Sequence, residues 1–250
     1  MPRRAALVTG ASYGVGAATA LALARAGHDV AITATRTDNL RRTVENLADT
    51  GARVVPLALD LRMHDSIVRA FGEALAALGQ IDVLVNNAAV NLRRLALDLT
   101  PDEWDAVLET NARGTFFFSQ QAGRHWIAGK QPGCIVNVAS AHAFVGAAER
   151  STYGISKAAI IHMTKMLAVE WGEHGIRVNA VAPGRMQTGS PSRAEKGADP
   201  AYIGAVLKRI PLHRLATAEE VAAAVCYLAS PQAAAITGQT IVLDGGLTVA

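Results

Sequence analysis

Residues 5–16 read AALVTGASYGVG, an apolar run that passes directly into three closely spaced glycines. The apolar run predicts a buried strand over residues 5–9, and the alanine-rich segment that follows predicts a helix over residues 15–26. Glycine allows a tight turn, and the unpaired N–H groups at a helix start attract an anion. A strand, a glycine-rich loop and a helix in this order predict a site for the pyrophosphate of a dinucleotide. A plain turn into a helix is the alternative for the glycines taken alone.

The rest of the chain alternates between short apolar segments and helical ones. Further strands are predicted over residues 30–35, 54–59, 83–85, 135–138, 177–182 and 240–244, and further helices over 38–50, 63–78 and 152–173. Capping boxes that open at Thr100 and Thr217 mark the starts of two more helices. Strands that alternate with helices pair in parallel through right-handed crossovers. We therefore predict the α/β class: one doubly wound Rossmann-type domain over residues 1–250, with a parallel seven-stranded sheet and helices on both faces.

Composition excludes several classes of protein. Lys and Arg exceed Asp and Glu by three, and the basic residues are dispersed, so no nucleic-acid partner is predicted. Cys134 and Cys226 are far apart and form no CxxC pattern, so neither a disulfide framework nor a metal site is expected. No apolar run has the length of a membrane span or a signal peptide. A soluble protein of the cytoplasm, with no membrane association, is the expectation.

Tyr153 and Lys157 are the most informative pair of polar residues. At positions i and i+4 of a helix, their side chains share one face. A nearby cation favours the phenolate and lowers the tyrosine pKa from its usual value of about 10, which makes the phenol a competent general acid or base. The pair occurs by chance in many amphipathic helices, so its meaning depends on the motifs that precede it.

Those motifs resemble the short-chain dehydrogenase/reductase family along the whole chain. The matching positions, in order, are Thr9-Gly10-x-x-x-Gly14-x-Gly16, Asp60-Leu61, Asn86-Asn87-Ala88, Asn111, Ser140, Tyr153-x-x-x-Lys157, Asn179, Pro183-Gly184 and Asp244-Gly245-Gly246. Ala89 departs from the family, which usually has glycine there, and this affects local backbone geometry rather than chemistry.

The resemblance implies four catalytic residues. Tyr153 would exchange a proton with the substrate oxygen, and Lys157 would lower the Tyr153 pKa and bind the nicotinamide ribose. Ser140 would hold the substrate oxygen, and Asn111 would anchor a water that links Lys157 to solvent. Taken singly, Ser140 is also explained as a strand-end cap, and Asn111 as a helix-interior amide that bonds backbone.

The resemblance also implies a cofactor groove at the carboxyl ends of the strands. Its predicted residues are Gly10, Ser12, Tyr13, Gly14, Val15, Gly16, Thr35, Arg36, Asp60, Leu61, Asn87, Ala88, Tyr153, Lys157, Pro183, Gly184 and Thr188. Arg36 stands where members that prefer NAD usually have Asp, and a guanidinium pairs well with a 2′-phosphate. NADP(H) is therefore favoured. Tyr13 replaces a basic residue of many NADP-preferring relatives, which leaves NAD(H) open.

The substrate is the least specified part of the prediction. The implied reaction is reduction of a carbonyl, or oxidation of a secondary alcohol, with Ser140, His142 and Arg150 as candidate substrate contacts and a lid at about residues 187–212. Narrower alternatives are a 3-oxoacyl-carrier-protein reductase and a sugar or polyol dehydrogenase. A non-catalytic nucleotide-sensing regulator is the rival from another class. The apolar helix over residues 152–173 suits a partner subunit, and the family implies a homotetramer.

Overall fold

The computed structural model describes residues 3–186, 204 and 206–250 of the chain. Within these residues, seven parallel strands form one sheet in the order β3-β2-β1-β4-β5-β6-β7. The strands are β1 (Arg4–Val8), β2 (His28–Ala34), β3 (Val54–Ala58), β4 (Val83–Asn86), β5 (Gly133–Val138), β6 (Ile176–Pro183) and β7 (Thr240–Leu243). The predicted Rossmann-type α/β class is confirmed.

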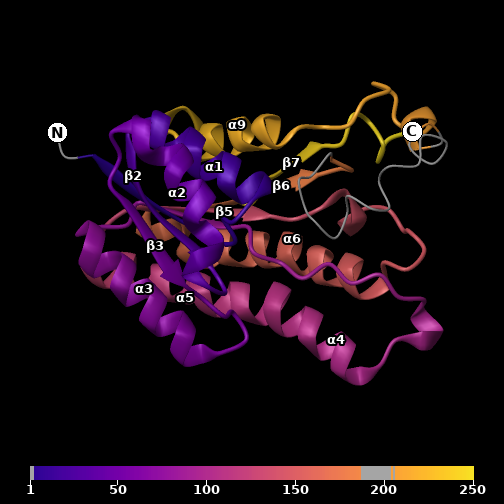
Figure 1. Ribbon diagram of the computed structural model, residues 1–250, viewed down its shortest axis with the longest axis horizontal. Coiled ribbons are helices and arrows are strands. Elements are labelled where there is room, and N and C mark those ends of the chain that lie inside the picture. Colours follow the sequence, from indigo (N-terminus) through magenta and orange to yellow (C-terminus); the bar gives the residue numbers. More distant parts are fainter. Residues whose placement is uncertain (1–2, 187–203, 205) are drawn as a thin grey trace.

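Helices cover both faces of this sheet (Figure 1). One layer contains α1 (Gly14–Arg25), α2 (Arg41–Leu47) and α9 (Ala218–Ala229). The opposite layer contains α3 (His64–Leu78), α5 (Thr115–Gly129) and α6 (Ser151–Trp171). Each layer encloses its own apolar core against the sheet, because the parallel strands are apolar on both sides.

The segment between β4 and β5 differs most from a simple helix. After a loop with a 3₁₀ turn (Ala96–Asp98), it forms α4 (Pro101–Leu108), passes through a π-helical turn (Glu109–Gly114) and continues as α5. The capping box predicted at Thr100 is present, because its side chain accepts from Glu103 N and the Glu103 carboxylate accepts from Thr100 N. The π-helical turn was not predicted, and it contains Asn111.

Other differences from the predicted boundaries are small. The helix predicted over residues 38–50 is a 3₁₀ turn (Thr37–Leu40), α2 and a second 3₁₀ turn (Ala48–Thr50). Asp244 lies just beyond β7 instead of within it, where its carboxylate accepts from Gly246 N at 2.8 Å and Thr248 N at 2.7 Å. Shifts of one or two residues at the ends of elements are ordinary.

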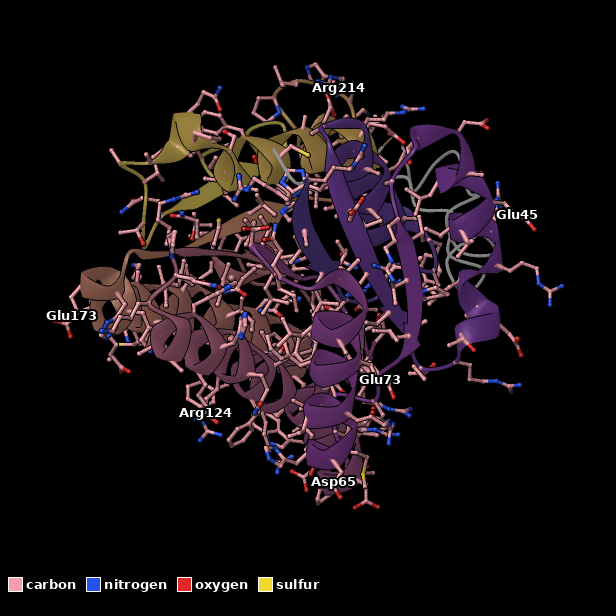
Figure 2. The ribbon with its side chains drawn as sticks, turned by 90° about the vertical axis from the view of Figure 1, so that its left-hand side faces the viewer. Glu45, Asp65, Glu73, Arg124, Glu173 and Arg214 are labelled. Carbon is pink, nitrogen blue, oxygen red and sulfur yellow. The ribbon has the colours of Figure 1, made fainter. Side chains whose placement is uncertain are left out.

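Charged side chains lie on the outer surfaces of the helices. Glu45 of α2, Asp65 of α3 and Arg124 of α5 all point away from the sheet (Figure 2). Among the described residues, no helix is both long and apolar enough to cross a membrane, and no group of three or more His, Cys, Asp or Glu is placed to hold a metal ion.

The strand order reverses between β1 and β4, which are neighbours in the sheet. In an open parallel sheet such a reversal leaves a crevice at the carboxyl ends of the two strands, and ligands bind there. The loops that follow β1 and β4 are therefore the place to look for a site.

Candidate active site

The glycine-rich loop after β1 is folded tightly against the loop after β4. Gly10 has a φ of +65°, and a Cβ there would lie 2.7 Å from Ala88 Cα. A Cβ on Gly16 would lie 2.3 Å from Gly10 O, so only glycine fits. Gly14 also has a positive φ, of +60°, but a Cβ there would meet nothing within 4 Å. Two glycines therefore serve close packing, while Gly14 faces open space at the start of α1.

Two threonines fix this loop from opposite sides. Thr9 Oγ1 accepts hydrogen bonds from Asn87 N at 2.9 Å and Ala88 N at 3.0 Å, and Asn87 Nδ2 donates to Gly10 O at 2.9 Å. From α2, the buried Thr43 donates through Oγ1 to Ala11 O at 2.8 Å. Thr43 was missed by sequence reasoning, because a threonine within a helix carries no motif.

The start of α1 keeps its N–H groups available. Tyr13 occupies the N-cap position without a side-chain capping bond, and its side chain is exposed. Ser12 is half-buried and Val15 is buried within the first turn. An uncapped helix start beside the open space at Gly14 offers hydrogen-bond donors and a partial positive charge to an anion.

Tyr153 and Lys157 lie together in the first two turns of α6. Lys157 Nζ stands 5.8 Å from the centroid of the Tyr153 ring and donates to Val138 O at 2.7 Å. The Lys157 side chain is buried, and burial lowers its pKa from 10.5 to about 8. An amine with such a pKa gains and loses its proton readily near neutral pH.

Ser140 follows β5 and is buried beside this pair. Its Oγ accepts from His142 N at 3.2 Å, which is the capping bond expected of a residue that ends a strand. That bond uses a lone pair of the hydroxyl and leaves its hydrogen to be donated elsewhere. The His142 ring packs edge-on against the Tyr153 ring, with 6.2 Å between centroids.

Asn111 is buried, and its amide is engaged with backbone and with α6. Its Oδ1 accepts from Val90 N at 2.7 Å, and its Nδ2 donates to Val90 O at 2.9 Å and to Ser156 Oγ at 3.0 Å. These contacts match the backbone-bonding alternative and tie the loop after β4 to the helix of Tyr153. Both amide hydrogens are used, so a water anchored here would depend on main-chain groups.

The acidic and basic residues after β2 and β3 form local ion pairs. Arg36 is exposed, and its Nη2 lies 3.8 Å from Asp38 Oδ2; Thr35 beside it is also exposed. Arg62 binds Asp60 through Nε at 3.0 Å and Nη2 at 2.7 Å, which holds the pKa of Asp60 below its usual range. Asp38 and Arg62 are partners that the sequence did not single out.

The remaining predicted positions lie along the same edge of the sheet. Leu61 is buried, and a Cβ on Gly114 would lie 2.4 Å from Leu61 O. Pro183 ends β6, and a Cβ on Gly184 would lie 2.7 Å from Asp244 Cα. Residues 187–203 and 205 of the predicted lid, which include Thr188, lie outside the described residues.

Arg150 is the N-cap residue of α6, and its Nη1 donates to Asn91 Oδ1 in the loop after β4. Its carbonyl accepts from Gly154 N at 2.7 Å. A cavity of about 320 Å³ adjoins this region, lined by the 142–147 loop, Arg150 and the side of α6 that carries Gly154 and Ala158.

Comparison with known proteins settles the family. A family model described as enoyl-(acyl carrier protein) reductase matches residues 10–248. The chain belongs to the short-chain dehydrogenase/reductase family. It is an oxidoreductase that acts on alcohol and carbonyl groups.

Relatives of this short-chain dehydrogenase/reductase match over nearly their full length. A probable 2,4-dienoyl-CoA reductase of Bacillus subtilis is 38% identical, with 98% of this chain and 97% of the relative covered. A 3-oxoacyl-acyl-carrier-protein reductase of Thermotoga maritima is 37% identical, with 97% of each covered. A crystal structure from Agrobacterium tumefaciens, described as a putative 2-deoxy-D-gluconate 3-dehydrogenase with bound NADP, has a TM-score of 0.90 at 34% identity; the match covers 99% of this chain and 97% of that one.

The site of this short-chain dehydrogenase/reductase fits a dinucleotide. The open space at Gly14 and the uncapped start of α1 suit a pyrophosphate. Arg36 lies after the neighbouring strand β2. The ribose attached to that pyrophosphate would lie near this strand end. Tyr153 and Lys157 lie on α6, which follows β5 in the other half of the sheet, beyond the reversal between β1 and β4.

Proposed function

We propose that the protein reduces a carbonyl to a secondary alcohol, or catalyses the reverse reaction, with NADP(H) as hydride carrier and Tyr153 as general acid or base. The observation that carries the proposal is the Tyr153–Lys157 pair, in which a buried ammonium stands 5.8 Å from the phenol ring. A bound nicotinamide would supply or accept the hydride, and the protein must then move only a proton.

Each proposed catalytic residue has one task. Tyr153 donates a proton to the substrate oxygen during reduction and removes it during oxidation. The Lys157 cation favours the phenolate form of Tyr153, since opposite charges stabilise each other more strongly away from water. Ser140 donates its hydroxyl hydrogen to the same substrate oxygen. Asn111 positions the loop after β4 against α6 and so holds the first turn of that helix in place.

NADP(H) is the proposed cofactor, with NAD(H) as the alternative. Arg36 supports it, because a guanidinium at the end of β2 can pair with the 2′-phosphate that distinguishes the two nucleotides. The NADP described with the Agrobacterium relative supports it independently. The cofactor contacts proposed here are the loop and strand-end residues named above, from Gly10 to Gly184.

Several broader expectations are part of the same proposal. We propose one oxidoreductase domain with a lid at about residues 187–212, which acts in the cytoplasm as a homotetramer on a small carbonyl or alcohol substrate. A 3-oxoacyl-carrier-protein reductase and a sugar or polyol dehydrogenase are the narrower alternatives, and the Thermotoga and Agrobacterium relatives represent one each. A nucleotide-sensing regulator would need no Tyr153–Lys157 pair, so we do not favour it.

The test is oxidation of NADPH and NADH by purified protein across a panel of 3-oxoacyl thioesters, ketoses, diketones and cyclic ketones. Tyr153→Phe should lower kcat by about 100-fold or more while nucleotide binding, followed by NADPH fluorescence, is retained. Tyr227→Phe is the matched control, because Tyr227 is exposed on α9. Unchanged turnover in Tyr153→Phe would contradict the assignment, and tight nucleotide binding without turnover of any substrate would favour the regulator.

A further inference from the structure

Two loops at the carboxyl edge of the sheet are cross-linked beside Tyr153. One loop follows β4 and carries Asn91 and Arg93, and the other leads into α6 and carries Glu149 and Arg150. Arg93 binds the Glu149 carboxylate through Nε at 3.0 Å and Nη2 at 2.9 Å, and Arg150 Nη1 donates to Asn91 Oδ1. The guanidinium of Arg150 is thereby held at a fixed place between the two loops.

The backbone conformation at Glu149 keeps the Glu149 carboxylate apart from the Arg150 guanidinium. Glu149 has a φ of +62°, in the left-handed region that residues with a Cβ rarely adopt. Such a conformation persists where contacts hold it, and Arg94 N donates to Glu149 O at 3.1 Å. The turn directs the Glu149 carboxylate to the exposed Arg93, while the next residue directs its guanidinium to Asn91. The acid and the base therefore face different partners, although they are adjacent in sequence.

Arg150 is also fixed relative to the reacting groups. It is three residues before Tyr153, and the bond from Gly154 N to Arg150 O closes the first turn of α6. Residues three apart in a helical turn are neighbours, with Cβ atoms roughly 5–6 Å apart. The His142 ring lies against the Tyr153 ring and links this turn to Ser140. The half-buried Arg150 thus begins the same helical turn that carries Tyr153, next to the loop of Ser140 and His142.

We propose that Arg150 binds a carboxylate of the substrate while the substrate carbonyl faces Ser140 and Tyr153. The substrate class is then a small oxo acid and its hydroxy acid, an inference that rests on the proposed reductase function. A guanidinium matches a carboxylate with two parallel, charge-assisted hydrogen bonds. The partial positive charge at the start of α6 adds to the attraction. Asn91 is a positioning residue, because it holds the guanidinium and need not touch the substrate.

The kinetic test uses matched acids and esters. NADPH oxidation is measured with 2-, 3- and 4-oxopentanoate and with their methyl esters, so that only the charge and the position of the carbonyl vary. Arg150→Gln should raise KM for the preferred acid roughly ten- to hundredfold, the worth of a hydrogen-bonded charge, and leave KM for its ester unchanged. Arg150→Lys should restore part of the loss. Arg124→Gln, which removes the same charge from the outer surface of α5 (Figure 2), should change neither constant.

A binding test makes the inference independent of turnover. Pentanoate and pentanamide, which differ in charge and are not reduced, are titrated into the enzyme saturated with NADP⁺. The wild type should bind pentanoate more tightly by about tenfold, and Arg150→Gln should bind both equally. Equal binding by the wild type, or a preference for pentanoate that survives in Arg150→Gln, would overturn the carboxylate site. Tyr153-dependent reduction of the esters alone would overturn this inference and leave the reductase proposal standing.

Discussion

Lys157 shows at the scale of one residue how function limits stability. Its ammonium is buried, and the hydrogen-bond partner described for it is the neutral carbonyl of Val138. Burial disfavours the charged form and lowers the pKa from 10.5 to about 8. An apolar side chain at this position would therefore cost the fold less free energy than the buried ammonium does.

Replacing Lys157 by Met should abolish turnover and raise the free energy of unfolding at pH 7 by about 3 kcal/mol, since the cost of burying the charge disappears. The folded pKa is depressed, so between pH 8 and 10.5 the unfolded chain binds more protons than the folded one. The free energy of unfolding of the wild type should therefore increase relative to that of Lys157→Met as the pH rises through this window. Urea unfolding of both proteins at pH 7 and pH 10 measures the difference; a difference that does not change with pH would contradict the explanation.

Arg36 and Asp38 should set the choice between the two nicotinamide cofactors. Arg36→Ala should raise KM for NADPH about tenfold or more and KM for NADH little, because only NADPH offers a 2′-phosphate. Asp38→Asn should lower KM for NADPH by about two- to threefold, since the exposed Asp38 carboxylate pairs with Arg36 and repels the phosphate. Steady-state kinetics with both nucleotides provides the measurement, with Asp49→Asn on the surface as control. Equal effects of Arg36→Ala on the two cofactors would contradict the 2′-phosphate contact.

Sequence predicted some residue placements and not others, for a physical reason. Tyr153 and Lys157 share a face because helical geometry alone decides it. The partners of Thr43 and Asn111 depend on which elements pack together, and no local pattern specifies that. The sequence left two roles open for Asn111, and only the packing of the elements shows that its amide contacts Val90 and Ser156.

At the scale of elements, the glycines of the loop after β1 are needed for two different reasons. Gly16→Ala should destabilise the protein by about 2–4 kcal/mol, because the new methyl group would overlap Gly10 O and Asn87 Nδ2. Gly14→Ala meets open space and should cost only about 1–2 kcal/mol for its left-handed backbone, while weakening nucleotide binding. Thermal unfolding without nucleotide compares the two. A larger loss in Gly14→Ala would contradict this account.

Element boundaries were predictable where the chain itself supplies the end groups. Both capping boxes are present, and Gly51, Gly79 and Gly175 end their segments in the left-handed conformation. The π-helical turn could not be predicted from the sequence. It inserts an extra residue into the helix, and this insertion depends on the packing of Gly114 against Leu61 and of Asn111 against Val90.

At the scale of the whole molecule, one face of α6 remains to be explained. Ile155, Met166 and Val169 lie within about 60° of each other on the helix and are 48%, 48% and 83% exposed. Exposed apolar side chains in a row favour contact with another protein surface. This face supports the proposed homotetramer, in which helices of two subunits would pack together.

Val169→Asp should therefore lower the molar mass of the native particle measured by light scattering, from four chains to two or one. Met63→Asp introduces the same charge at an exposed apolar residue before α3 and should leave the mass unchanged. A monomeric wild type, or an unchanged mass in Val169→Asp, would contradict an interface on this face of α6.

The strand order also gives the sheet two edge strands that differ from each other. β3 and β7 form the outer strands, and β3 contains Pro56, whose nitrogen has no hydrogen to offer to a neighbouring backbone. β7, Thr240–Leu243, contains no proline. Strand-to-strand growth into fibres needs both borders of each sheet, so the proline blocks one of the two contacts that an endless chain of sheets requires. Pairing of two copies through β7 would therefore end at Pro56 instead of continuing into an open-ended fibre.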